Sequence, residues 1–365
     1  MDAKTPAPAF LWFKAALACC ASGVLISSAL AANVTANSAT TIANAINNAK
    51  NGDVITIQSG SYNMSGKAPL KLSASSVSIV GSGVTLDFAA SASSSSGRGI
   101  DITGSSNLVR GLTIKRAPDN GIHIEGNGNT IDRCITFQCF DTGIQISGKS
   151  DGSTKPANNK IVNCDSHDNF DTAANGGNAD GFAAKISIGA GNSFTGCVAH
   201  DNSDDGWDTF PKAATGTFPV TISRCVAYHN GFHNNVSSGN GNGFKVGSDA
   251  TGGANHKIDH SIAITNKSKG FDQNHNMGRV TIDHCTGSDC GADEFAFSEF
   301  TNGGTFTKNV CNGSFNVKGT LSGNVTSGIT FVSKDPTKMT RDGNGNLVFN
   351  SFMKFANSGG AGANP

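Results

Sequence analysis

Short runs of alternating hydrophobic and polar residues recur along most of the chain, and each run is only a few residues long. Lys160-Ile161-Val162 and Val220-Thr221-Ile222 are representative, and turn-forming Asn, Gly and Asp residues border such runs. Alternation with a period of two is typical of β-strands, and the bordering residues are typical of turns. Because the repeated region contains no hydrophobic segment of about ten residues or more, the pattern predicts coils of short strands rather than helical repeats or βαβ units.

A column of small residues sets the period of these coils. When the coils are aligned, one position is occupied by Cys134, Cys164, Cys197, Cys225, Ser261 and Cys285. The intervals are 30, 33, 28, 36 and 24 residues, and an irregular period in this range is typical of a solenoid with loops of varied length. We therefore expect an all-β protein, a parallel β-helix with one coil per copy, in which most of the cysteines are stacked interior thiols.

A second column lies five residues after the first in every copy. Its members are Cys139, Asn169, Asn202, Asn230, Asn266 and Cys290. A constant offset through four consecutive asparagines is not expected of residues scattered by composition alone. Because an amide side chain both donates and accepts hydrogen bonds, inward-facing asparagines on successive coils can bond to one another and to the backbone. The sequence therefore predicts an asparagine ladder along the axis of the β-helix.

The two ends of the repeat region have different patterns. Ile42, Ala45, Ile46 and Ala49 fall at helical spacing, and an Asn-Gly-Asp turn then leads to a strand at 54–57. A short amphipathic helix followed by a first strand fits the need of a solenoid to cap its terminal coil. At the other end, the apolar stretch 346–355 is expected to fold back over the coils.

We divide the chain into a signal peptide at 1–32, a catalytic β-helix domain at 33–350 and a C-terminal tail at 351–365. Lys14 precedes an apolar run of limited length that is rich in alanine and serine, and small residues suited to cleavage follow at Ala31 and Ala32. This run is too short for a convincing membrane span. The sequence thus predicts a secreted protein that is not held in a membrane.

The formal net charge of zero and the low content of charged residues, 15%, narrow the range of partners. No basic excess favours nucleic acid or an anionic membrane surface as a partner. Attraction of a polyanion would therefore have to come from a local site, and we expect the protein to act as a monomer.

Each coil carries a glycine followed by a bulky apolar residue, and candidate chemistry is found at fixed positions around that glycine. Asp180 and Asp205 directly precede it, Asp204 lies one residue further back, and Asp208 and Lys245 follow it by two residues. The bulky residue faces inward, so the residue after it faces outward, and stacked coils lie about 4.8 Å apart. If the chain bends at Gly206, four carboxylates and one amine meet in a single patch on the outer surface.

Four carboxylates at close range resist ionising together unless a cation is present. Calcium takes roughly six to eight oxygen ligands with loose geometry, whereas magnesium prefers to keep its waters. A lysine beside a bound divalent cation loses basicity and can then act as a general base. The pattern favours a calcium site at Asp180, Asp204, Asp205 and Asp208 with Lys245 as base, although Asp272 on the following coil would oppose the loss of basicity.

At these residues the chain resembles polysaccharide lyase family 9, the pectate lyases and exopolygalacturonate lyases. The segments NADGFAAK, AHDNSDDGWD and NGNGFK are similar to the three site segments of that family, and the resemblance extends over roughly 40–350. It implies a right-handed parallel β-helix, an aspartate pocket for Ca²⁺ and a lysine base. It also implies calcium-dependent β-elimination on de-esterified homogalacturonan, with 4,5-unsaturated oligogalacturonides as products.

Several alternatives stay open on the residues alone. The carboxylates could hold a calcium ion that only stiffens the coil, or they could be solvated turn residues without a metal. Asp204 and Asp205 could serve a glycoside hydrolase, which needs two carboxyl groups. A lyase or epimerase acting on another polyuronate and a non-catalytic carbohydrate-binding β-helix also fit. Further basic residues that could bind carboxylates, but that we interpret as surface charge, are Lys185, Lys212, Lys269 and Arg279.

Overall fold

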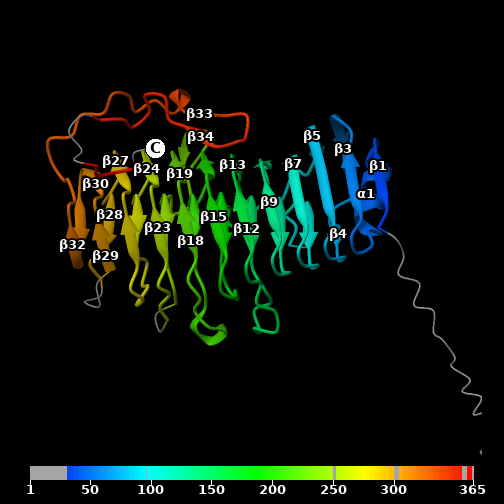
Figure 1. Ribbon diagram of the computed structural model, residues 1–365, viewed down its shortest axis with the longest axis horizontal. Helices are drawn as coiled ribbons and strands as arrows, with labels where there is room; N and C mark the ends of the chain where they lie inside the picture. Colours follow the sequence, from blue (N-terminus) through cyan, green and yellow to red (C-terminus); the bar gives the residue numbers. More distant parts are fainter. Residues whose placement is uncertain (1–30, 96, 250–251, 300–303, 356–359, 364–365) are drawn as a thin grey trace, which may run out of the picture. The chain divides into compact units, whose positions relative to one another are not determined.

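The computed structural model describes residues 31–95, 97–249, 252–299, 304–355 and 360–363. The expected signal peptide at 1–32 therefore falls almost entirely outside the described residues. Parallel strands of two to ten residues wind into successive coils, which Figure 1 shows stacked side by side. The predicted parallel β-helix is confirmed.

One strand of each coil belongs to a ten-stranded parallel sheet. Its strands, in order, are β4 (Leu70–Leu72), β6 (Ile100–Ile102), β8 (Ile122–Ile124), β11 (Ile144–Ile146), β14 (Phe182–Ala184), β17 (Trp207–Asp208), β22 (Phe244–Lys245), β25 (Phe271–Asp272), β28 (Phe295–Phe297) and β31 (Phe315–Val317).

The other strands of the coils form a twenty-stranded sheet with two parallel series, which share the long strands β5 (Ser78–Asp87) and β7 (Leu108–Lys115). The first series also contains β1 (Asn33–Ala36), β2 (Val54–Ile57), β9 (Thr130–Asp132), β12 (Lys160–Val162), β15 (Ser193–Thr195), β18 (Thr221–Ser223), β23 (Lys257–Asp259), β26 (Thr281–Asp283), β29 (Gly304–Thr307) and β32 (Gly319–Ser322). The second also contains β3 (Gly60–Asn63), β10 (Ile135–Phe137), β13 (Asp165–His167), β16 (Val198–His200), β19 (Val226–Tyr228), β24 (Ile262–Ile264), β27 (Thr286–Ser288) and β30 (Val310–Asn312).

The register of the ten-stranded sheet places equivalent residues of successive coils directly over one another. The inward aromatic rings of Phe182, Trp207, Phe244, Phe271 and Phe295 form one stack, with centroids 4.7 to 5.0 Å apart. This spacing matches the distance between hydrogen-bonded strands, so each ring packs on the next. The residue that follows each ring must then face outward, which sets the position of the candidate site.

The N-terminal coil is capped as the sequence predicts. Helix α1 (Ala39–Asn47) begins after Ser38, whose hydroxyl accepts a hydrogen bond from the Thr41 backbone N–H in a capping box. Ile42 and Ile46 are buried against the first coil. The sequence did not reveal β1, which precedes the helix and pairs with β2.

Neutral polar columns run through the interior. The predicted ladder is confirmed, because the Asn169, Asn202 and Asn230 amide groups each donate to the carbonyl oxygen of the next asparagine side chain at 2.7 to 2.9 Å. The cysteine column is also confirmed, since the cysteines of the described residues are free and nearly all of them buried.

A second asparagine ladder, at another corner of the coils, was not predicted. It consists of Asn107, Asn129, Asn159 and Asn192, and each of the first three donates its backbone N–H to the next side chain. Asn129, Asn159 and Asn192 each lie five residues before a column cysteine. The sequence therefore held the same kind of signal, a constant offset, on the other side of the cysteine.

The C-terminal segment lies across the coils, as expected from its apolar residues (Figure 1, red). It contains the 3₁₀ turn η2 (Pro336–Lys338) and the antiparallel pair β33 (Thr340–Arg341) and β34 (Leu347–Val348). Phe349, Phe352 and Met353 pack against a hydrophobic cluster on the second strand series. A second antiparallel pair, β20 (Phe232–His233) and β21 (Val236–Ser237), lies in a loop between β19 and β22. No helix within the described ranges is long and apolar enough to cross a membrane.

Candidate metal centre and active site

Three of the four predicted aspartates converge where two neighbouring central strands of the ten-stranded sheet, β14 and β17, begin. Each of Asp180, Asp204 and Asp205 offers one carboxylate oxygen to a group whose members all lie within 4.8 Å of one another. All three are buried. Asp180 directly precedes the glycine that leads into β14, while Asp204 and Asp205 lie in the connection from β16 to β17. The stacking of two coils therefore creates the cluster.

Gly206 makes the tight approach of the next coil possible. A Cβ atom at this position would lie 2.6 Å from the carbonyl oxygen of Gly243 and 3.0 Å from Ala227. The strand begins only after this glycine, at Trp207, so Asp205 belongs to the turn and Asp208 to the strand. In one continuous strand, residues three apart would face opposite sides of the sheet. Because Asp205 lies in the turn before the strand, it can lie on the same side as Asp208.

Backbone and amide donors from neighbouring loops orient two of the carboxylates. Asp204 accepts hydrogen bonds from the backbone N–H groups of Asn178 at 2.9 Å and Asn240 at 2.6 Å. One oxygen of Asp205 accepts from the backbone and the side-chain amide of Asn242, at 2.7 and 2.9 Å. Sequence reasoning missed these three asparagines. Asn178 and Asn240 lie in irregular loops and have no equivalent position in the other coils, whereas Asn242 directly precedes the column glycine Gly243.

Lys245 lies beside this cluster as predicted. The register pairs it with Asp208 on one side and Asp272 on the other. Its Nζ is 3.0 Å from Asp205 Oδ2 and 3.9 Å from Asp208 Oδ1. Asp272 instead pairs with Lys269, whose Nζ lies 2.8 Å from Asp272 Oδ1. The carboxylate that the sequence suggested as a competitor for Lys245 thus has a cation of its own.

Lys185 is a component of the site, so its interpretation as surface charge is wrong. Its Nζ lies 2.8 Å from Asp180 Oδ2 and 3.7 Å from Asp208 Oδ2, and its side chain is only 13% exposed. Ala183, the partner of Asp208 in the sheet register, has a small side chain that leaves room for the lysine two residues later. The alternation Phe182 in, Ala183 out, Ala184 in already placed Lys185 on the outer face. Lys212 and Arg279 are exposed.

Burial and mutual repulsion dominate the electrostatics of the cluster. Burial, followed by the neighbouring Asp204 carboxylate, raises the pKa of Asp205 to about 7 against the opposing effect of Lys245. Burial likewise raises the pKa of Asp180, although Lys185 works to lower it. Burial alone would lower the pKa of Lys245, but the surrounding carboxylates, led by Asp208, outweigh it and raise that pKa. The carboxylates therefore have too few cations around them.

The donor set fits a hard divalent cation. Oδ2 of Asp205 and Oδ1 of Asp208 are buried and have no hydrogen bond within the described structure, although lysine ammonium groups lie nearby. Such oxygens are costly to bury unless a charge meets them. An all-oxygen set with several carboxylates is typical of calcium ligands. Asp180, Asp204 and Asp205 would hold the ion. Asp208 lies between Lys185 and Lys245, where its carboxylate can complete the ligand set.

Comparison with known proteins agrees with this architecture. Residues 26–309 match the family described as Pel9A-like, right handed beta helix region. A solved structure of pectate lyase Pel9A superimposes with a TM-score of 0.76 at 28% identity, covering 86% of this chain and 83% of that one. A rhamnogalacturonan lyase, at 21% identity and a TM-score of 0.70, shares the fold.

Two curated relatives are similar in sequence. Pectate lyase L of Paenibacillus polymyxa (strain SC2) is 42% identical over 221 residues, which are 59% of this chain and 49% of that protein. Pectate lyase L of Dickeya dadantii (strain 3937) is 45% identical over 127 residues, 34% of this chain and 29% of the relative. The matched region thus spans about half, or less, of the length of these relatives. Because the family match covers most of the chain, the protein belongs to the Pel9A-like right-handed β-helix family, polysaccharide lyase family 9.

Proposed function

We propose that the protein is a secreted pectate lyase that cleaves de-esterified homogalacturonan by calcium-dependent β-elimination. The observation that carries this proposal is a buried cluster of aspartates with a lysine amine at its edge, on one outer face of the β-helix. The names of the relatives and of the solved Pel9A structure support the substrate class. Export is supported by the apolar N-terminal segment of the sequence.

The residues of the cluster have separate tasks. Asp180, Asp204, Asp205 and Asp208 would hold Ca²⁺, which when bound supplies positive charge for the uronate carboxylate and for the negative charge that develops next to it. The amides of Asn178, Asn240 and Asn242 keep the carboxylates in place, because each donates to an aspartate oxygen that faces the loops. Oδ2 of Asp205 and Oδ1 of Asp208 accept none of these bonds, so both oxygens are available to the ion.

Lys245 is the proton acceptor in the proposed reaction. Its amine takes the proton from C5 of the uronate, the C5–H electron pair forms the C4–C5 double bond, and the bond from C4 to the glycosidic oxygen breaks. The departing oxygen takes a proton from water. Lys245 can serve as a base only after giving up its own proton, and the carboxylates that hold its pKa high are the same ones that a bound cation would neutralise.

Product analysis on polygalacturonate tests this function. We expect products with the ultraviolet absorbance of a conjugated uronate and a mass one water lower than that of hydrolysis products, formed with calcium and not with a chelator. Saturated oligogalacturonides as the only products would instead indicate a hydrolase. Full activity in the chelator would contradict the metal requirement.

A further inference from the structure

A cavity lies beneath the C-terminal segment, on a different corner of the coils from the aspartate cluster. Its volume is about 330 Å³, at the lower end of the range of roughly 300–1,000 Å³ that small-ligand sites occupy. Asn163, Gly196, Arg224 and His260 line one side, and each follows a strand of the first series, β12, β15, β18 or β23. The cavity therefore spans four consecutive coils.

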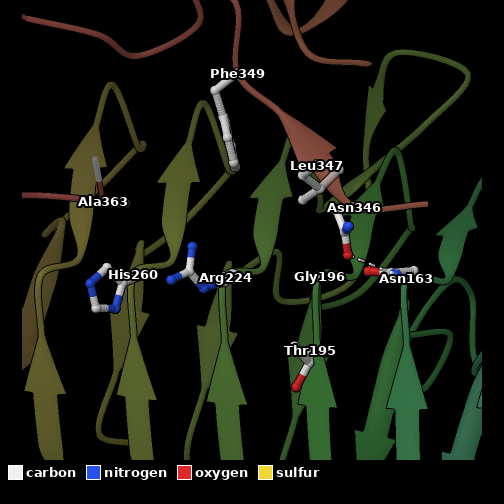
Figure 2. Close-up of a pocket in the computed structure, with 9 residues that line it drawn as sticks. All are labelled: Asn163, Thr195, Gly196, Arg224, His260, Asn346, Leu347, Phe349 and Ala363. Carbon is white, nitrogen blue, oxygen red and sulfur yellow. Dashed lines mark hydrogen bonds between the residues drawn. The ribbon is translucent and has the colours of Figure 1, made fainter. Parts of the chain in front are cut away.

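Gly196 forms part of the floor of this cavity. It stands in the column between Asn163 and Arg224, and adjacent coils are about 4.8 Å apart. A Cβ atom here would lie 2.2 Å from the side-chain oxygen of Asn163, so Asn163 fills the space beside this glycine. Thr195, just before it, also lines the cavity, and Figure 2 shows its side chain below Gly196.

Arg224, an exposed residue, brings a positive charge that no acidic side chain in the described part of the chain pairs with. No ion pair or side-chain hydrogen bond involves its guanidinium within those residues, and Figure 2 shows the group directed toward the space below Phe349. The nearest acid on the adjoining coil, Asp259, is already engaged by Ser223, by Lys257 at 3.1 Å and by His260 at 3.3 Å. The cavity therefore favours an anion.

The opposite wall combines apolar and amide groups. Leu347, Phe349 and Ala363 supply apolar surface, while Asn346 adds an amide that lies 3.5 Å from the amide of Asn163. A guanidinium group prefers a planar carboxylate, which it can bind through two parallel hydrogen bonds. Aromatic and aliphatic surface fits the C–H face of a sugar ring, and amide and hydroxyl groups fit its hydroxyls.

From these contacts we propose that the cavity is a non-catalytic binding site for a uronate residue of an acidic polysaccharide. Arg224 binds the carboxylate, Phe349 and Leu347 contact the ring, and Asn346 with Thr195 bonds to hydroxyls. The class of ligand, a carboxylated sugar, follows from the cavity, whereas the choice of galacturonate rests on the proposed function. A second site on another corner would hold the polymer to the protein independently of the aspartate cluster.

The test is the binding of digalacturonate to the full chain in the presence of a chelator, measured by calorimetry. Arg224→Asn is the informative variant, because asparagine tolerates the positive φ of 54° at this turn and Asn163 occupies the equivalent position one coil from Gly196. Arg279→Asn, at an exposed arginine outside the cavity, is the matched control. We expect Arg224→Asn to weaken binding at least tenfold, with the control and Asp205→Asn unchanged.

Two results would overturn the proposal. One is equal digalacturonate binding by wild type and Arg224→Asn. The other is binding of galactose or inorganic phosphate as tight as that of digalacturonate, since galactose lacks the carboxylate and phosphate lacks the sugar ring. Failure of the catalytic proposal has a different signature. In that case polygalacturonate stays intact while the Arg224-dependent binding persists. As a second readout, Arg224→Asn should raise KM for the polymer and leave kcat on trigalacturonate unchanged.

Discussion

The asparagine ladder and the aspartate cluster lie only a few residues apart in the same connection, yet they solve the stacking of polar groups in different ways. In the ladder, Asn202 donates to Asn230 at 2.9 Å and accepts from Asn169 at 2.7 Å. In the cluster, Asp205 has no donor of its own and depends on Asn242 and on the ammonium of Lys245. Both sets repeat with the coil.

The difference follows from hydrogen-bonding capacity. An amide has a donor and an acceptor, so identical amides can stack without limit, whereas an ionised carboxylate only accepts. Stacked carboxylates therefore need cations, and in the protein without a bound ion the two lysines provide only part of the positive charge required. A repeated neutral column is thus a structural element, and a repeated acidic column indicates a place where positive charge has to be bound.

The largest effect is expected for Lys245→Ala, which removes the base but leaves every aspartate. Loss of a general base lowers the rate by about 10²–10⁴-fold. Turnover of polygalacturonate should fall by this amount, measured as the rate of unsaturated product formation. Calcium binding by calorimetry and the melting temperature with calcium serve as controls, and activity close to wild type would reject Lys245 as the base.

Asn202→Asp converts one rung of the ladder to the chemistry of the cluster without a cation nearby. Its side chain would lose the bonds donated to Asn230 and Ser166, and an acceptor would face an acceptor. We expect the free energy of unfolding to fall by about 3 kcal/mol, as for other uncompensated buried polar groups. Denaturant unfolding measures this, with Asn255→Asp at an exposed position as control. An unchanged midpoint would show that the ladder is not stabilising.

Asp205→Asn is the reverse substitution, carried out in the cluster. It removes one buried charge from the proposed ligand set, and we expect calcium affinity to fall about a hundredfold, close to 3 kcal/mol. Direct calcium titration by calorimetry checks the value. If the affinity matched that of wild type, Asp205 would not be a ligand.

Lys185→Met separates the ion-pairing role of this lysine from metal binding. The substitution leaves Asp180 without its ammonium partner, so the chelated protein should lose about 2 kcal/mol of stability. Calcium should restore more stability in the variant than in wild type, because one competing cation is gone. Melting temperatures with calcium and with chelator measure both effects, and a smaller calcium-induced shift would contradict this competition.

The smallest expected effect concerns pH. The raised pKa of Asp205, about 7, means that this group is increasingly protonated as the pH falls below 7 and ionised above it. Calcium binds the ionised form, so its affinity should fall by up to about tenfold between pH 7 and pH 6 and change less above pH 8. Calorimetry in buffers of different ionisation enthalpy should also detect released protons. An affinity that rose on acidification would exclude this coupling.

Much of this could be predicted because it is periodic. The cysteine and asparagine columns and the shared register of Asp208 and Lys245 follow from constant offsets between copies. The alternation along β14 placed Lys185 on the outer face, but nothing in the spacing showed that its side chain would reach back along the strand to Asp180. The loop donors Asn178 and Asn240 and the cavity under residues 346–349 depend on irregular segments, whose paths are set by tertiary packing.

The ion pairs that Lys185 and Lys245 make with the aspartates have a consequence for the order in which the protein folds and binds calcium. Since Lys185 and Lys245 already pair with Asp180, Asp205 and Asp208, the chain can complete its coils in a compartment poor in divalent ions. Metal acquisition then becomes a later step that exchanges one form of neutralisation for another. Calcium in the surroundings would thus be required for catalysis after the protein has folded, and not for folding itself.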